Sequence, residues 1–183
     1  MKKLLLGIAA VCLAGFTFAQ DAPLWMRHSV ISPDGTTIAF TYKGDIYTVP
    51  VAGGRAMQIT TNPAYDTAPV WSPDSKRIAF ASDRMGSLDV YIVAKDGGEP
   101  RRLTTHSGSE TPLAFTDAGH VLFSAGIMPS AEAVVFPSNG QFNQVYRVSV
   151  EGGRPTMISS MPMECISCLL YTSPSPRDMR RSR

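Results

Sequence analysis

The chain has 183 residues, of which 44% are hydrophobic and 17% are charged, and its formal net charge is +2. Without its two atypical ends, residues 1–19 and 168–183, 11 basic and 14 acidic residues remain, and the net charge becomes −3. This balance excludes the basic footprint of a protein that binds nucleic acid or an anionic membrane surface. Only Cys165 of the three cysteines lies outside those ends, so no disulfide framework is expected.

Residues 1–19 have the pattern of a secretory signal peptide. The basic pair Lys2-Lys3 precedes an apolar run that ends in the small-x-small cleavage site Thr17-Phe18-Ala19. We predict cleavage after Ala19 and export to the periplasm or the medium. No membrane anchor is expected afterwards, because the apolar run is too short to span a bilayer. A lipoprotein signal at Cys12 is the alternative, which the bulky residue before that cysteine disfavours.

A repeated sequence unit follows the signal peptide. Its marker occurs as Ile38-Ala39-Phe40, Ile78-Ala79-Phe80 and Val121-Leu122-Phe123, at intervals of 40 and 43 residues. The turns Ser32-Pro33-Asp34-Gly35 and Ser72-Pro73-Asp74-Ser75 introduce the first two copies. Self-similarity at this period indicates a stack of identical supersecondary units.

Each unit is expected to contain four short strands. In the second unit, turn residues and alternating polarity place them at residues 68–72, 77–82, 88–94 and 100–105. Along the third of these strands, Val90 and Ile92 share one face, while Tyr91 and Val93 share the other. A large apolar residue precedes the first turn of every unit and should lie between neighbouring sheets: Ile31, Trp71 and Phe115.

The third turn of the unit is its most regular part. A Gly-Gly pair closes it each time, because a tight turn between strands needs positive φ: Gly53-Gly54, Gly97-Gly98 and Gly152-Gly153. A tyrosine lies 6 residues before the first glycine, and a threonine or serine lies 7 residues after it: Tyr47, Tyr91, Tyr146, Thr60, Thr104 and Ser159.

These units predict an all-β fold, a β-propeller of four-stranded antiparallel blades. The expected blades are residues 25–61, 68–105 and 112–160, with a fourth beginning at 162–167. Three blades form an incomplete ring, since the smallest common propellers have four. We therefore expect this chain to be an N-terminal fragment of a parent with six or more blades.

The end of the chain departs from the repeat. Composition changes abruptly after Ser167, and Cys168–Asp178 resembles a transposase-type sequencing adapter translated in one frame. We expect residues 168–183 to be non-biological. A disordered tail rich in Pro, Ser and Arg is the alternative.

Loop length predicts where a ligand would bind. The first and third turns of each unit should share one face of the propeller, and the second turns and inter-blade linkers the other. The third unit carries an insertion in its second turn, around residues 127–142. Insertions on one face of a repeat array are often the binding surface, although a decorative loop is equally compatible. The candidate substrate or partner face comprises Tyr65, Asp66, His106, Glu110, Phe136 and Phe142.

The sequence carries no constellation typical of catalysis, cofactor binding or metal binding. Gly-x-Ser-x-Gly and His-Glu-x-x-His are missing, and Cys165–Cys168, whose second cysteine belongs to the atypical end, has no second Cys-x-x-Cys to pair with. The three histidines, His28, His106 and His120, are isolated from one another in the sequence. Asp83 and Asp89 could suggest a metal, but aspartates beside a hairpin loop more often cap turn amides. We expect no catalytic, cofactor or metal residues in this chain.

The repeat motifs resemble a known family of propeller units. The Ser-Pro-Asp turn, Ile-Ala-Phe, Asp89-Val90-Tyr91 and the Gly-Gly turn with its Leu/Ile-Thr-Thr ending are similar to the PD40, or WD40-like, repeat. That repeat forms the propellers of tricorn-type peptidases and of TolB. The segments Leu24–Gly35 and Pro112–Asp117 resemble exported tricorn-like proteins, which are serine peptidases of the S41 class.

The resemblance implies that the parent acts on peptide or protein substrates. Further blades, a PDZ-like domain and the peptidase core would follow in cis, and the propeller would steer or filter substrate. None of the family's catalytic residues matches a position of this chain. Two alternatives remain open: a TolB-like periplasmic binding propeller, and the propeller of a prolyl-oligopeptidase-type hydrolase.

The signal peptide predicts a defined mature N-terminus. Expressed in a bacterium with its natural leader, the chain should be exported and should begin at Gln20, which mass spectrometry of the periplasmic fraction would detect. Ala19→Leu should block processing, because the cleavage site needs a small residue there. A product that stays in the cytoplasm with residues 1–19 attached would contradict the prediction.

Overall fold

The computed structural model describes residues 25–126 and 143–159. The expected signal peptide, insertion, fourth blade and tail therefore lie outside the described residues. The described parts form twelve β-strands and no helix, so none of them provides an apolar helix that could cross a membrane.

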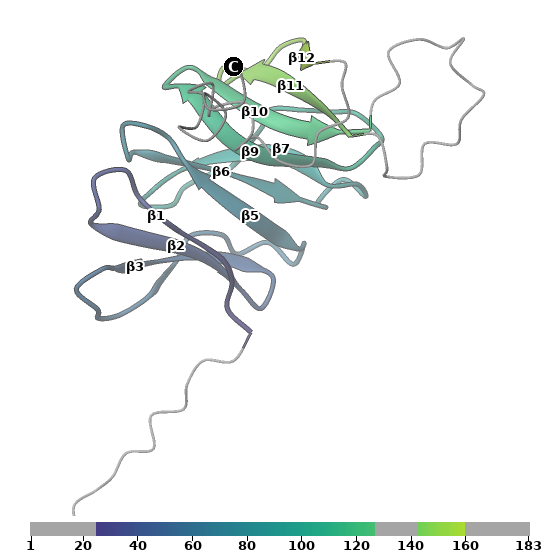
Figure 1. The fold of residues 1–183 in the computed structure, drawn as a ribbon. Coiled ribbons are helices and arrows are strands. Elements are labelled where there is room, and N and C mark those ends of the chain that lie inside the picture. The colour runs from purple at the N-terminus through teal and green to yellow at the C-terminus, as the bar shows by residue number, and fades with distance from the viewer. Residues whose placement is uncertain (1–24, 127–142, 160–183) are drawn as a thin grey trace, which may run out of the picture.

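Three four-stranded sheets follow one another along the chain and in space (Figure 1). The first contains β1 (Arg27–Ile31), β2 (Thr37–Tyr42), β3 (Asp45–Pro50) and β4 (Met57–Gln58). The second contains β5 (Asp66–Trp71), β6 (Arg77–Ser82), β7 (Asp89–Ala94) and β8 (Arg101–Arg102). The third contains β9 (Glu110–Asp117), β10 (His120–Ala125), β11 (Gln144–Ser149) and β12 (Thr156–Ser159). Every pair is antiparallel and joins strands adjacent in sequence, so the predicted blade architecture is confirmed.

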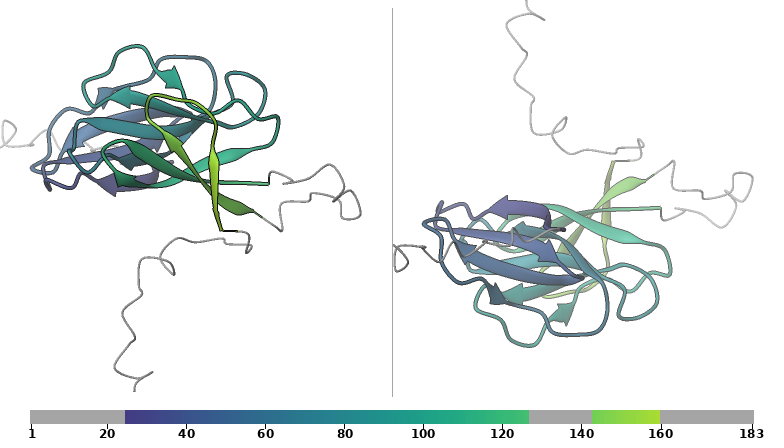
Figure 2. Two further views of the ribbon diagram at one scale, coloured as in Figure 1. Left: turned by 90° about the horizontal axis from the view of Figure 1, so that it is seen from above. Right: turned by 90° about the horizontal axis from the view of Figure 1, so that it is seen from below.

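The first strands of the blades lie side by side, β1 against β5 and β5 against β9. The blades therefore fan around their first strands, and the third sheet is turned relative to the first (Figure 2). The predicted strands of the second blade are confirmed within two residues, except for the fourth. That strand ends at Arg102 because the Thr104 hydroxyl, rather than a backbone carbonyl, accepts the hydrogen bond from Val90 N–H.

Apolar packing between the blades forms two cores. The core between the first and second blades contains Ala39, Ile46, Ile59, Trp71, Ile78, Phe80, Tyr91 and Val93. The core between the second and third contains Ala79, Val90, Ile92, Leu103, Val121, Phe123, Ala125, Tyr146, Val148 and Val150. The two predicted faces of β7 are thus confirmed, because Tyr91 and Val93 belong to one core and Val90 and Ile92 to the other.

The large apolar residues before the first turns behave differently at the edge of the array. Trp71 is buried toward the first blade, and its indole N–H donates to the Val30 carbonyl at 3.2 Å. Phe115 packs against the core between the second and third blades. Ile31 remains 54% exposed, contrary to the expectation that it lies between sheets, because no described blade precedes β1.

The regular tyrosines stack on the phenylalanines of the repeat marker. The ring pairs Phe40–Tyr47, Phe80–Tyr91 and Phe123–Tyr146 have centroids 5.9, 5.9 and 5.7 Å apart. In each pair the two residues are direct cross-strand neighbours. Such pairs stabilise a sheet beyond their buried area, which explains the fixed tyrosine spacing.

The first turns are held by their own side chains. Asp34 accepts hydrogen bonds from the Ser32 hydroxyl and from Thr36 N–H, and these bonds lower the pKa of its carboxyl group. Ser75 has φ of 56° where the first turn has Gly35 at 71°. Its hydroxyl accepts a bond from Asp34 N–H at 3.1 Å, which ties neighbouring turns together.

The hydroxyl of Thr104 should be needed for stability. Thr104→Val would leave the buried Val90 N–H without its partner at 2.9 Å, and we expect a loss of about 1 to 3 kcal/mol in the free energy of unfolding. Thr105→Val, at the exposed neighbouring position, should change it by less than about 0.5 kcal/mol. Urea unfolding of both variants measures the difference, and equal effects would contradict this role.

Candidate functional site

Backbone hydrogen bonds separate two faces of the array as expected. On one face the first and third turns of a blade meet, through Val51 N–H to Thr36 O and Lys95 N–H to Lys76 O. On the opposite face, called here the loop face, linkers meet second turns. Asp66 N–H donates to Gly44 O there, and Glu110 N–H donates to Leu88 O. The predicted grouping of second turns and linkers is therefore confirmed.

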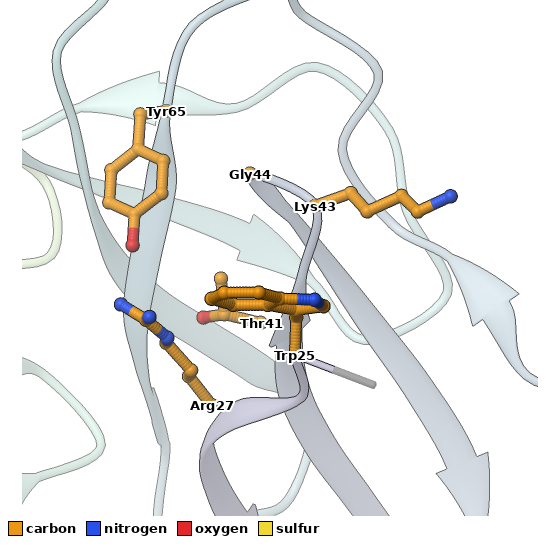
Figure 3. Close-up of a pocket in the computed structure, with 6 residues that line it drawn as sticks. All are labelled: Trp25, Arg27, Thr41, Lys43, Gly44 and Tyr65. Atoms are coloured by element: carbon orange, nitrogen blue, oxygen red, sulfur yellow. The ribbon is translucent and has the colours of Figure 1, made fainter. Parts of the chain in front are cut away.

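A cavity of about 410 Å³ opens on the loop face between the first two blades (Figure 3). It is lined by Trp25, Arg27, Thr41, Lys43, Gly44 and Tyr65. Three segments meet here: the start of β1, the turn that joins β2 to β3, and the linker that enters β5. Only Tyr65 among these residues was predicted as part of the substrate face.

Local backbone geometry positions the cavity walls. Lys43 and Gly44 form a two-residue turn with φ of 52° and 92°, the twist that a tight hairpin between β2 and β3 requires. Strand β1 has a bulge between Arg27 and Val30, with His28 at φ 49°. Bulges re-aim neighbouring side chains, and this one lies directly after Arg27.

The polar groups of the cavity are a guanidinium and a buried hydroxyl. Arg27 and Thr41 face each other across the β1–β2 pair, and the guanidinium carbon of Arg27 lies 5.7 Å from the centre of the Trp25 ring. Thr41 is 2% exposed, and its hydroxyl has no hydrogen-bond partner. In Figure 3 the Tyr65 hydroxyl is directed toward Arg27, whereas Lys43 points away from the other side chains.

Asp66 and Glu110 occupy equivalent places at the starts of β5 and β9, and both are fully buried. Asp66 pairs with Arg84 at 2.8 Å, and the Arg84 guanidinium lies 5.1 Å from the centre of the Tyr91 ring. Asp66 is therefore a buried carboxylate that forms an ion pair at the boundary between the first two blades. It does not line the cavity beside Tyr65.

Glu110 lacks an equivalent partner. Neither of its carboxyl oxygens has a partner by hydrogen-bond geometry, and the nearby Arg102 pairs instead with the buried Asp89 at 2.8 Å. Burial raises the pKa of Glu110 to about 7, with the charge of Asp89 adding to the rise and the nearby Thr104 hydroxyl and Arg102 opposing it. Among the described residues, Asp89 belongs to no group of three or more potential protein ligands for a metal ion.

The remaining candidates do not join the cavity. His106 is exposed in the linker between β8 and β9, where its Nδ1 accepts a bond from Gly108 N–H at 3.0 Å. Phe136 and Phe142 lie outside the described residues. His28 contacts Thr67 across the first blade boundary at 3.1 Å, and His120 contacts Asp117 at 3.0 Å.

Sequence reasoning missed Trp25, Arg27 and Thr41 as members of one site. Their spacing gives no signal, because the bulge in β1 and the cross-strand pairing bring them together. The one available clue was the short second turn of the first blade, Lys43-Gly44, which does not cover the cavity between the first two blades.

Antiparallel four-stranded blades stacked face to face, with a cavity on the loop face, define a β-propeller of the WD40-like class. A family model described as the tricorn protease N-terminal beta propeller domain matches residues 23–168. The chain belongs to this family.

Named relatives include peptidases and TolB. The chain is 35% identical over 102 residues to tricorn protease homolog 1 of Streptomyces coelicolor, a match that covers 55% of the chain and 9% of the relative. It is 30% identical over 129 residues to the uncharacterized peptidase YuxL of Bacillus subtilis, a match that covers 69% of the chain and 20% of YuxL. A solved structure of putative TolB from Agrobacterium tumefaciens matches with a TM-score of 0.59 at 22% identity. This match covers 76% of the chain and 50% of the TolB chain. The chain thus spans a fifth or less of these two peptidases, and the likeness to TolB shows the fold alone.

Glu110 should make stability depend on pH. Its pKa rises from 4.5 to about 7 on folding. Between pH 4.5 and pH 7 the native state therefore keeps a proton on Glu110 that the unfolded state has lost. The free energy of unfolding should therefore fall as pH rises from about 4.5 to about 7. Glu110→Gln, which mimics the protonated group, should be more stable than the parent chain at pH 8 by about 1 to 2 kcal/mol, and nearly equal to it near pH 4.

Urea unfolding at both pH values tests this expectation. Glu99→Gln, at an exposed position before β8, is the matched control and should leave the pH dependence unchanged. An identical pH dependence in Glu110→Gln and the parent chain would show that Glu110 titrates normally.

Proposed function

We propose that this chain is the N-terminal propeller of an exported serine peptidase of the S41 class, in which it steers or filters peptide substrates. The family match over residues 23–168 carries the proposal. The catalytic residues would lie elsewhere in the parent, within a peptidase core that follows the propeller and a PDZ-like domain in cis. Peptides and unfolded protein segments are the expected substrates.

The geometry of the loop face supports a steering role. The Trp25 and Tyr65 side chains are 70% and 42% exposed beside a cavity, whereas the other boundary between described blades buries Asp89 and Glu110. Aromatic walls with a few polar groups are typical of ligand sites. The signal-like residues 1–19 support export, and they lie outside the described residues.

A TolB-like binding propeller is the second candidate function. It is favoured by the repeat motifs, such as the Ser-Pro-Asp and Gly-Gly turns, which resemble those of TolB as well as those of tricorn-type peptidases. Such a protein would bind a protein partner through the loop face and would need no peptidase core.

Kinetics of the complete parent protein test the proposal. Tyr65→Ala should raise KM for a peptide of about ten residues by about 3- to 10-fold, the loss of roughly 1 kcal/mol of aromatic contact. It should leave the kinetics of a minimal fluorogenic substrate unchanged, because that substrate cannot reach both the propeller and the catalytic serine.

Met85→Ala is the matched control, since Met85 is 68% exposed in the second turn of the next blade and outside the cavity. It should leave both substrates unaffected. A parent that neither cleaves peptides nor reacts with a fluorophosphonate would overturn the peptidase assignment and favour the TolB-like alternative. Equal effects of Tyr65→Ala on long and minimal substrates would overturn the steering role and leave the peptidase assignment in place.

A further inference from the structure

We infer that the cavity between Trp25 and Tyr65 is a subsite for an acidic side chain, Asp or Glu, of a bound peptide. That the ligand is a peptide rests on the proposed function. The preference for a carboxylate comes from the charges and hydrogen-bonding groups of the cavity itself.

The guanidinium of Arg27 is available to an anion. None of the ion pairs among the described residues includes Arg27, whose recorded contact is with the Trp25 ring at 5.7 Å. By contrast, two arginines of the second blade, Arg84 and Arg102, are already paired with buried aspartates. A guanidinium presents paired donors that match the two oxygens of a carboxylate.

The hydroxyl of Thr41 provides a second group that lacks a partner. It is buried, it lacks a hydrogen bond, and its residue lies opposite Arg27 in the β1–β2 register. The oxygen is shielded from solvent, so a ligand oxygen can accept its proton only when a lining side chain moves aside, and that bond would then satisfy a buried group that lacks a partner. We expect one carboxylate to engage both groups, because Arg27 and Thr41 are cross-strand partners that line the same cavity.

The aromatic walls suit the rest of the ligand. In Figure 3 the Trp25 ring lies on one side of the Arg27 guanidinium, and the Tyr65 side chain lies on another. These rings can pack on the methylene groups of an acidic side chain and on the adjoining peptide. The cavity of about 410 Å³ admits one side chain with part of its backbone, not an extended polyanion.

Two of the neighbouring acidic groups, Asp45 and Asp66, are engaged by other side chains, whereas Asp83 accepts a bond from Tyr65 N–H at 2.7 Å and places a negative charge beside the cavity. Asp45 accepts a bond from the Gln58 amide at 3.0 Å and lies 3.4 Å from the Thr60 hydroxyl. Asp66 is held by Arg84. Lys43 adds positive charge at the rim, although its ammonium lies 5.3 Å from the centre of the Tyr42 ring and points away from the cavity.

Binding of short blocked peptides to the chain tests the inference. The probes are acetyl-Ala-Glu-Leu-Ala-amide, its Gln counterpart, and the Gln peptide with a free carboxyl terminus. Isothermal titration calorimetry should show at least tenfold tighter binding of the Glu peptide than of the blocked Gln peptide. This preference should weaken between 50 and 500 mM salt, because the interaction is partly exposed to solvent.

Substitutions assign the preference to the cavity. Arg27→Gln should abolish the difference between the Glu and Gln peptides, and Thr41→Val should reduce it about threefold. Arg55→Gln removes an exposed arginine outside the cavity and should leave it intact. Circular dichroism should show that the variants retain the fold.

Equal affinity for the Glu and Gln peptides, or an unchanged preference in Arg27→Gln, would overturn the inference. Tighter binding of the peptide with the free terminus than of the Glu peptide would also overturn it, in favour of a site for chain ends. These outcomes are independent of peptidase kinetics in the parent. The Tyr65→Ala effect on KM can persist without an acidic preference, and the preference can persist in a TolB-like binding protein.

Discussion

Apolar contact between neighbouring sheets is the interaction on which the rest of this structure depends. The second blade shows it most fully, because β7 buries Tyr91 and Val93 toward the first blade and Val90 and Ile92 toward the third. A sheet that buries both faces has no solvated side on which to place polar residues. Polar chemistry is therefore confined to the ends of the strands, at the two faces of the array.

The two faces use those strand ends differently. On one, the first and third turns are fixed by short side-chain networks, as in Ser32–Asp34, and by the bond between neighbouring turns from Asp34 N–H to Ser75. On the loop face, linkers enter the next blade beside second turns of unequal length. The short Lys43-Gly44 turn leaves a cavity there, whereas the same boundary one blade later buries Asp89 and Glu110.

Much of the fold could be predicted from the sequence. The Gly-Gly turns have the positive φ that their residue type indicated, and the regular tyrosines stack on the phenylalanines of the repeat marker. The exposure of Ile31 was not predicted, because the environment of a residue depends on the neighbouring sheet as well as on its own. The site was predicted less well: Tyr65 lines the cavity, whereas Asp66 and Glu110 are buried at the blade boundaries and His106 lies apart.

The sequence by itself determined the repeat, the order of strands within a blade, and the face on which loops vary. These follow from local periodicity and turn chemistry, which act over a few residues. Only the tertiary structure decided which polar groups share a site. Arg27, Thr41 and Tyr65 meet because a bulge in β1, the β1–β2 register and the docking of the second blade act together. Whether a carboxyl group finds a partner, as Asp66 does with Arg84, was likewise decided by packing between segments distant in the chain.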